Sequence, residues 1–273
     1  MKRLFKSKWA MGILVSAWAL GASVASAAPT ECARVGTGTP AFSMAVASNF
    51  FEPGKEILAL YPQTVEICHN ASGTLINEIK AQPNRYQLFL SADEARPGQV
   101  PNGTDGIFTY AKGIPALWSS VLTSSQQLLS GGKVNKTAVT SLAVADPVGA
   151  PYGAAAKAIL EDMNQWVTPS PTGWIEQFDN ISLTKDAADK DVTTTNTKKA
   201  AFVSKAQICK QLTSPYKYAQ FNDYAFKQNG VLVNTTNTTA NSAAKQFKTY
   251  LLSRDVQQDL VDNKCYGSQV LNQ

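Results

Sequence analysis

The sequence predicts an α/β protein, because apolar strand-like runs alternate with helix-like patterns along most of the chain. The first such unit is a buried strand over residues 41–47, followed by a helical pattern over 50–60 with Pro53 in its first turn. The 273 residues are 44% hydrophobic and 16% charged, which is enough apolar material for a core. This composition excludes a disordered chain, a collagen and a long coiled coil.

The other elements follow the same alternation. Strands are predicted at residues 64–68, 86–90, 141–145 and 199–204, an extended segment at 108–118, and helices at 75–81, 154–163, 243–252 and 255–261. Loops are predicted at 97–106, 146–153 and 234–239, while 168–196 is polar, weakly periodic and unassigned. Strands that alternate with helices favour mainly parallel sheets.

The N-terminus has the pattern of an export signal. Four basic residues precede Trp9, an uncharged apolar run of about 16 residues reaches Val24, and the small residues Ala25-Ser26-Ala27 follow. The run is shorter than the roughly 20 residues that span a bilayer, so we expect residues 1–27 to be a cleavable signal peptide. Residues 28–273 carry 21 basic and 20 acidic residues, which argues against nucleic-acid binding.

The four cysteines are Cys32, Cys68, Cys209 and Cys265. In an oxidising compartment an even number favours two disulfides, and the sequence leaves all three possible pairings open. A metal site is the alternative, but there is no CxxC pair, and His69, the only histidine, is next to Cys68. Neighbouring strand residues point to opposite faces, so no metal site is predicted.

The common catalytic motifs are absent. The sequence has no GxSxG, HExxH or Walker A pattern, and Gly36-Thr37-Gly38 precedes a strand instead of opening a helix. A Ser-His-Asp triad would have to use His69. The sequence therefore does not predict an enzyme.

Neutral hydrogen-bond donors follow three predicted strands: Ser48-Asn49, Ser72-Gly73 and Tyr152-Gly153. Each pair precedes or opens a helix, where unpaired N–H groups and the positive end of the dipole bind anions without a basic side chain. Taken singly, Ser48 and Ser72 are better explained as N-caps. Loops at the carboxyl ends of strands in open α/β sheets converge on one crevice, so the three together indicate an anion site.

Several segments resemble the periplasmic molybdate-binding protein family of ABC importers. They keep their order over residues 41–267 and are 45–53, 71–73, 89–94, 108–113, 117–119, 145–147, 150–156, 201–207 and 247–253. The resemblance implies a two-lobed periplasmic-binding-protein fold of type II, with a ligand cleft between the lobes. It implies a first lobe of residues 28–116 plus 225–273 and a second lobe of residues 117–224.

The resemblance also implies a function. We expect a monomeric periplasmic protein without a cofactor that captures molybdate or tungstate and delivers it to the membrane permease of an ABC importer. By position, the expected ligand contacts are Ser48, Asn49, Ser72, Tyr152 and Val192. The alternatives are a receptor for sulfate, a phosphate ester or a small carboxylate, and a protein without a transport role on the same scaffold.

A site made only of donors suits a fully deprotonated dianion. A protonated oxygen would find no acceptor there, so molybdate and tungstate fit and hydrogen phosphate does not. Sulfate would have to be excluded by size. Removing a donor with Ser72→Ala or Tyr152→Phe should weaken binding by ~1–3 kcal/mol. Arg85 and Arg96 are expected on the surface, and Lys205 is the nearest cation to the predicted cleft.

Overall fold

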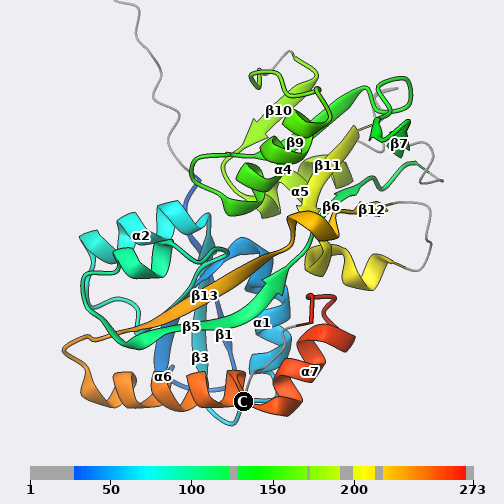
Figure 1. The fold of residues 1–273 in the computed structure, drawn as a ribbon. Coiled ribbons are helices and arrows are strands. Elements are labelled where there is room, and N and C mark those ends of the chain that lie inside the picture. The colour runs from blue at the N-terminus through cyan, green and yellow to red at the C-terminus, as the bar shows by residue number, and fades with distance from the viewer. Residues whose placement is uncertain (1–27, 123–127, 171–172, 191–198, 213–217, 269–273) are drawn as a thin grey trace, which may run out of the picture.

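The computed structural model describes residues 28–122, 128–170, 173–190, 199–212 and 218–268, which form two α/β lobes (Figure 1). The first lobe is built on a six-stranded sheet in the order β1-β3-β2-β4-β13-β5, and the second on a five-stranded sheet in the order β10-β9-β11-β6-β12. Within these residues no helix is long and apolar enough to span a bilayer. The predicted signal peptide, residues 1–27, lies outside the described residues.

The strands of the first sheet are β1 Glu31–Val35, β2 Phe42–Ala47, β3 Val65–Asn70, β4 Leu88–Leu90, β5 Gly103–Gly113 and β13 Phe226–Val233. Those of the second are β6 Pro115–Trp118, β9 Ser141–Ala145, β10 Ile175–Phe178, β11 Lys199–Ser204 and β12 Tyr218–Gln220. A separate hairpin pairs β7 Leu129–Ser130 with β8 Lys133–Val134.

The α-helices are α1 Phe51–Leu58, α2 Ser72–Ala81, α4 Pro151–Asp162, α5 Ile181–Lys190, α6 Thr238–Leu251 and α7 Arg254–Asp262. Short 3-10 helices are η1 Ser48–Phe50, η2 Arg96–Gln99, η3 Lys205–Gln211 and η4 Asn222–Tyr224. Because η1 runs directly into α1, the first helical turn begins at Ser48.

Helices cover both faces of each sheet, which explains the nearly continuous apolar strands. In β2, Met44 packs in the same cluster as Phe247 of α6, while the next residue, Ala45, packs with Leu75 of α2. In the second lobe, α4 packs against one face and α5 against the other through Ala188. Each lobe therefore has its own core.

The expectation of mainly parallel sheets is wrong, because both sheets are mixed. Parallel pairs are β2–β3, β2–β4, β9–β10 and β9–β11, and antiparallel pairs are β1–β3, β4–β13, β5–β13, β6–β11 and β6–β12. The reason is that the chain leaves the first lobe after β5 and returns through β13, which pairs antiparallel with β5. The predicted lobe boundaries at 116–117 and 224–225 stay predictions.

Most helix and strand predictions are confirmed within a few residues. The helix predicted to start at Ala154 begins at Pro151, which places Tyr152 in its first turn. The predicted loop 97–106 contains most of η2 and the start of β5, and the predicted loop 234–239 overlaps the start of α6 at Thr238. The unassigned segment 168–196 contains β10 and α5.

Two disulfides are present, as expected. Cys32–Cys68 joins directly paired positions of β1 and β3 inside the first lobe. Cys209–Cys265 links η3 of the second lobe to the segment after α7 in the first lobe. Among the described residues, the one cluster with metal-ligand spacing is Cys32, Glu66 and Cys68, and its two sulfur atoms are already bonded to each other.

Candidate functional site

A small cavity lies between the two lobes, where helix starts from both of them meet. Its lining from the first lobe is Ala47, Ser48, Asn49, Asn70, Ala71, Ser72 and Ala92, and from the second lobe Ala150, Pro151, Tyr152 and Ile181. None of these lining residues carries a charge. The cavity volume is about 10 Å³, room for roughly one water molecule.

Four helix N-termini contribute to this lining. Ser48 opens η1, Ser72 opens α2, Pro151 opens α4 and Ile181 opens α5. The amides of a first helical turn have no partner inside the helix, and the dipole makes this end positive. The positive ends of these helices favour an anion in the cavity. Pro151 has no N–H, and the amides of Ser182 and Leu183 in α5 already donate to Asn180, so only part of the first-turn amides is left for a ligand.

Ser72 is fully buried, and its Oγ accepts a hydrogen bond of 3.1 Å from the N–H of Ala92. A hydroxyl that accepts in this way still has its hydrogen to donate. The next residue, Gly73, donates its N–H to the carbonyl oxygen of Gly149 in the second lobe at 3.0 Å. A Cβ atom at Gly73 would lie 3.2 Å from Gly149 Cα, so the glycine permits this close approach of the lobes.

Asn49 uses its amide nitrogen inside the protein. Nδ2 donates to Gln228 Oε1 at 3.0 Å and to the Tyr266 hydroxyl at 3.2 Å. Within the described residues, Asn49 Oδ1 is buried and has no hydrogen-bond partner. The side chain therefore joins η1 to β13, and the donor that Asn49 can offer to a ligand is its main-chain N–H.

Tyr152 lines the cavity, but its hydroxyl faces a polar network at the lobe crossing. The oxygen accepts from Ser204 Oγ at 2.8 Å and from Gln228 Nε2 at 2.9 Å. A Cβ atom at Gly113 would clash with this oxygen, so the glycine makes room for it. Burial raises the pKa of the Tyr152 phenol, which keeps the hydroxyl neutral.

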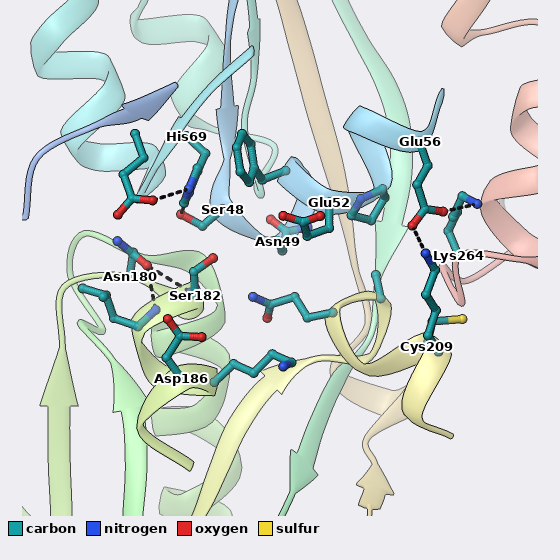
Figure 2. Close-up of a pocket in the computed structure, with 18 of the residues that line it drawn as sticks. Ser48, Asn49, Glu52, Glu56, His69, Asn180, Ser182, Asp186, Cys209 and Lys264 are labelled. Atoms are coloured by element: carbon teal, nitrogen blue, oxygen red, sulfur yellow. Dashed lines mark hydrogen bonds and ion pairs between the residues drawn. The ribbon is translucent and has the colours of Figure 1, made fainter. Parts of the chain in front are cut away.

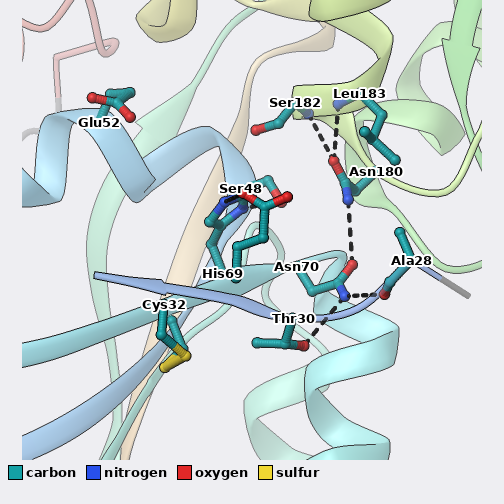
Figure 3. Close-up of polar contacts among 12 residues, drawn as sticks. Ala28, Thr30, Cys32, Ser48, Glu52, His69, Asn70, Asn180, Ser182 and Leu183 are labelled. Atoms are coloured by element: carbon teal, nitrogen blue, oxygen red, sulfur yellow. Dashed lines mark hydrogen bonds and ion pairs between the residues drawn. A yellow bond between two sulfur atoms is a disulfide. The ribbon is translucent and has the colours of Figure 1, made fainter. Parts of the chain in front are cut away.

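Asn70 and Asn180 bridge the lobes at one side of the cavity, as Figure 3 shows. Asn180 Nδ2 donates to Asn70 Oδ1 at 3.4 Å, and Asn180 Oδ1 accepts from the amides of Ser182 and Leu183 at the start of α5. Asn70 Nδ2 donates in turn to the carbonyl oxygen of Ala28 at 2.8 Å. The N-cap of α5 is thereby tied to the carboxyl end of β3.

A larger cavity of about 410 Å³ adjoins the small one and shares Ser48 and Asn49 with it (Figure 2). Its walls carry charges of both signs, including Glu52, Asp186 and Lys264. Figure 2 shows Asn180 at one end of it and Cys209 and Lys264 at the other. Ala28 lies at the Asn180 end, because both residues bond to Asn70. The larger cavity has charged walls, in contrast to the uncharged pocket beside it.

Four of the five residues expected to bind a ligand thus meet around one cavity: Ser48, Asn49, Ser72 and Tyr152. Val192 lies outside the described residues. Lys205 is not among the residues that line the small cavity, and burial lowers the pKa of its amine.

Arg85 is exposed, as expected, but Arg96 is not a simple surface residue. Arg96 pairs with Asp93 and donates from Nη2 to the carbonyl oxygen of Val148 in the second lobe at 2.6 Å. It therefore adds a contact between the lobes.

The sequence prediction missed residues that support the site from a distance. Asn180 has a recognisable signal, because asparagine ahead of Ile181-Ser182-Leu183 is a common N-cap. Gln228 has no recognisable signal in the sequence, since its partners Asn49 and Tyr152 are 179 and 76 positions away along the chain.

The sequence model of the bacterial extracellular solute-binding proteins matches residues 35–263, most of the chain. The chain belongs to this family. The family membership agrees with the absence of catalytic motifs, because its members bind solutes outside the cytoplasm.

Two curated relatives of this family member are molybdate-binding proteins named ModA. The protein of Rhodobacter capsulatus is 39% identical over 137 residues, covering 46% of this chain and 52% of the relative. The protein of Azotobacter vinelandii is 30% identical over 125 residues, covering 43% of this chain and 48% of the relative. The chain spans about half the length of the curated relatives it matches.

Solved structures show the same two-lobed solute-binding fold. The periplasmic molybdate-binding protein of Azotobacter vinelandii superposes with a TM-score of 0.67 at 20% identity, covering 84% of this chain and 99% of that one. L-phospholactate-bound PEB3 superposes with a TM-score of 0.53 at 10% identity, covering 84% of this chain and 100% of the PEB3 chain. The names of these two structures refer to different ligands, molybdate and L-phospholactate. The fold alone therefore does not identify the solute.

Proposed function

We propose that this solute-binding protein captures a molybdate or tungstate dianion in the small cavity between its lobes. The observation that carries the proposal is the meeting of four helix N-termini and two serine hydroxyls around a pocket with no charged lining. The likeness to two molybdate-binding relatives supports the same solute.

The proposed contacts come from both lobes. Ser48 and Ser72 offer hydroxyls, Asn49 and Tyr152 offer first-turn amides, and Val192 is the remaining proposed contact. Hydrogen bonds from neutral donors to a charged oxygen are short and strong. They also avoid a buried ion pair, whose desolvation can cost more than its attraction contributes.

The size of the cavity implies that the lobes move. A volume of about 10 Å³ holds about one water and not a tetrahedral oxyanion, so the lobes must separate for the solute to bind. The two connections between the sheets, between Gly113 and Pro115 and between Gln220 and Phe226, are the positions where a hinge movement would be absorbed.

The proposed setting is the periplasm. Residues 1–27 would direct export and be removed after Ala27, and the mature protein would act as a monomer without a cofactor or catalytic activity. The loaded protein would deliver its anion to the membrane permease of an ABC importer. The family model supports a location outside the cytoplasm, and the molybdate-binding relatives support the anion.

Calorimetry with molybdate, tungstate, sulfate and phosphate tests the proposal on the exported protein. We expect binding of the first two anions and at least about a hundredfold weaker binding of the other two, because phosphate is partly protonated and sulfate is smaller. Binding of sulfate, of a phosphate ester or of a small carboxylate in preference to molybdate would contradict the solute. Absence of binding to all of these would favour a protein without a transport role.

A further inference from the structure

The only histidine of the chain is placed directly behind one of the proposed anion donors. His69 pairs with Val46 in the β2–β3 ladder, two residues before Ser48. The residue is 6% exposed, and its ring packs on Phe51 with the centroids 4.0 Å apart. Nδ1 lies 3.0 Å from Ser48 Oγ (Figure 3).

The other ring nitrogen faces a carboxylate. His69 Nε2 lies 3.7 Å from Glu31 Oε2, because Glu31 is the cross-strand partner of His69 in the β1–β3 pair. In a neutral imidazole one nitrogen carries the hydrogen and the other accepts. A carboxylate beside Nε2 favours the hydrogen there, which leaves Nδ1 as an acceptor.

We propose that His69 couples proton uptake to oxyanion binding through Ser48. In the neutral ring, Nδ1 accepts the hydroxyl hydrogen of Ser48, so Ser48 Oγ presents only lone pairs to the cavity. In the protonated ring, Nδ1–H donates to Ser48 Oγ, and the hydroxyl hydrogen becomes free to donate to the anion. This inference rests on the proposed function. It specifies that Ser48 can donate to the anion only when the His69 ring is protonated.

The charges that surround His69 come from three elements. Glu31 on β1 and Glu52 on α1 favour the protonated ring, and Lys55 on α1 opposes it. Lys185 and Asp186 of α5 line the larger cavity that His69 also lines, and Lys185 pairs with Asp189.

In the free protein, burial lowers the pKa of His69 despite Glu31, so the ring is neutral at pH 7. A bound dianion favours the protonated ring and raises its pKa. The affinity is therefore highest below the pKa of the free protein. It falls about tenfold per pH unit as the pH rises from that pKa to the pKa of the complex, and is constant above it.

Nuclear magnetic resonance gives a direct test, because His69 supplies the only imidazole signal of an untagged protein. We expect saturating molybdate to raise the pKa of that signal by at least about one unit, which corresponds to tenfold preference for the protonated form. Calorimetry from about pH 5.5 to about 8.5, in buffers of different ionisation enthalpy, should show net proton uptake with a maximum between the two pKa values.

Two variants separate coupling from simple support of Ser48. His69→Asn keeps an amide near the position of Nδ1 that can donate at every pH, so its affinity should not vary with pH. Glu31→Gln removes the carboxylate beside Nε2 and should move the whole pH profile to lower pH. Circular dichroism checks that both fold, and the titration of the unmodified protein decides the question if one does not.

The coupling and the proposed function are overturned by different results. Binding of molybdate with the same affinity at every pH, with no proton uptake and no change in the His69 titration, would overturn the coupling and leave the proposed function intact. No binding of molybdate or tungstate at any pH would overturn the proposed function itself.

Discussion

Ser72 is the residue whose surroundings fit anion binding most directly. Its side chain is fully buried, its oxygen is held by the Ala92 amide, and it opens α2 at the edge of the cavity. The hydroxyl is therefore fixed by a donor, so its own hydrogen is the group left for a ligand oxygen. The same reasoning applies to Ser48 only when His69 is protonated.

Ser72→Ala should weaken molybdate binding by ~1–3 kcal/mol, because a buried ligand oxygen loses its donor. Calorimetry measures the change. Ser242→Ala on α6 is the matched control, since Ser242 is exposed and bonds only within its own helix turn to Thr238. An unchanged affinity in Ser72→Ala would exclude this hydroxyl from the site.

For Tyr152→Phe the sequence predicts a loss of affinity, whereas the structure predicts mainly a loss of stability. The hydroxyl accepts from Ser204 and Gln228, so its removal leaves two buried donors without a partner. We expect a loss of ~1–3 kcal/mol in the free energy of unfolding, measured in urea, with the affinity changed less than in Ser72→Ala. Tyr250→Phe on α6 is the control. A large loss of affinity with no loss of stability would show that the hydroxyl binds the anion.

At this scale the sequence predicted four residues that line the cavity and missed the residues that support them. Ser48 follows an apolar strand directly, and Ser72 and Tyr152 lie where the next helix begins after β3 and β9, so a one-dimensional pattern locates them. The roles of His69 and Gln228 depend on the register of β1, β3 and β13, which no local pattern contains.

Among the elements, the helices that open at the cavity are the ones that position its donors. Three of them were predicted, because α1, α2 and α4 have clear apolar faces behind strong strands. The fourth, α5, was not predicted, since its sequence ISLTKDAADK is polar and contacts the second sheet mainly through small residues such as Ala188. Tertiary packing, and not local propensity, forms this helix.

Asn180→Ala should destabilise α5 and reduce anion affinity together. The variant removes the cap on the amides of Ser182 and Leu183 and the contact with Asn70, at a cost of about 0.5–2 kcal/mol in the free energy of unfolding. Asn237→Ala is a matched control, because Asn237 caps α6 through the Ala240 amide and lies outside the cleft. Urea unfolding and calorimetry compare the two. Equal affinities in both variants would exclude the α5 N-terminus from the site.

For the whole molecule, the alternation of strands and helices predicted an α/β protein, and the resemblance to the molybdate-binding family implied its two lobes. The alternation did not predict that both sheets are mixed. The antiparallel strands that connect the lobes, β5 and β13, contain few local signals, and β13 has Gly230 in its middle. A Cβ atom at Gly230 would lie 2.6 Å from the Leu90 side chain, so the glycine serves close packing and not strand formation.

The Cys209–Cys265 disulfide should limit how far the lobes separate. The double variant Cys209→Ser with Cys265→Ser should increase the radius of gyration of the unliganded protein in solution scattering, and molybdate should reverse the increase. Cys32→Ser with Cys68→Ser is the matched control, because that disulfide lies within one lobe. It should lower stability by about 2–4 kcal/mol without changing the unliganded radius. Equal radii in both double variants would show that the Cys209–Cys265 bond does not restrict the lobes.

The placement of the Cys209–Cys265 bond makes the two ends of the larger cavity unequal. The Cys209 end is closed by a covalent bond together with the ion pairs of Lys210 and Lys264 with Glu56. Among the described residues, the other end is held by hydrogen bonds from Ala28 N to Asp179 and from Asn180 to Asn70, without a covalent bond. The contact between Ala28 and Asp179 becomes an ion pair once the chain is cut after Ala27 as proposed. Since hydrogen bonds exchange with water far more easily than a disulfide exchanges in an oxidising compartment, solute should arrive and leave past Ala28 and Asn180.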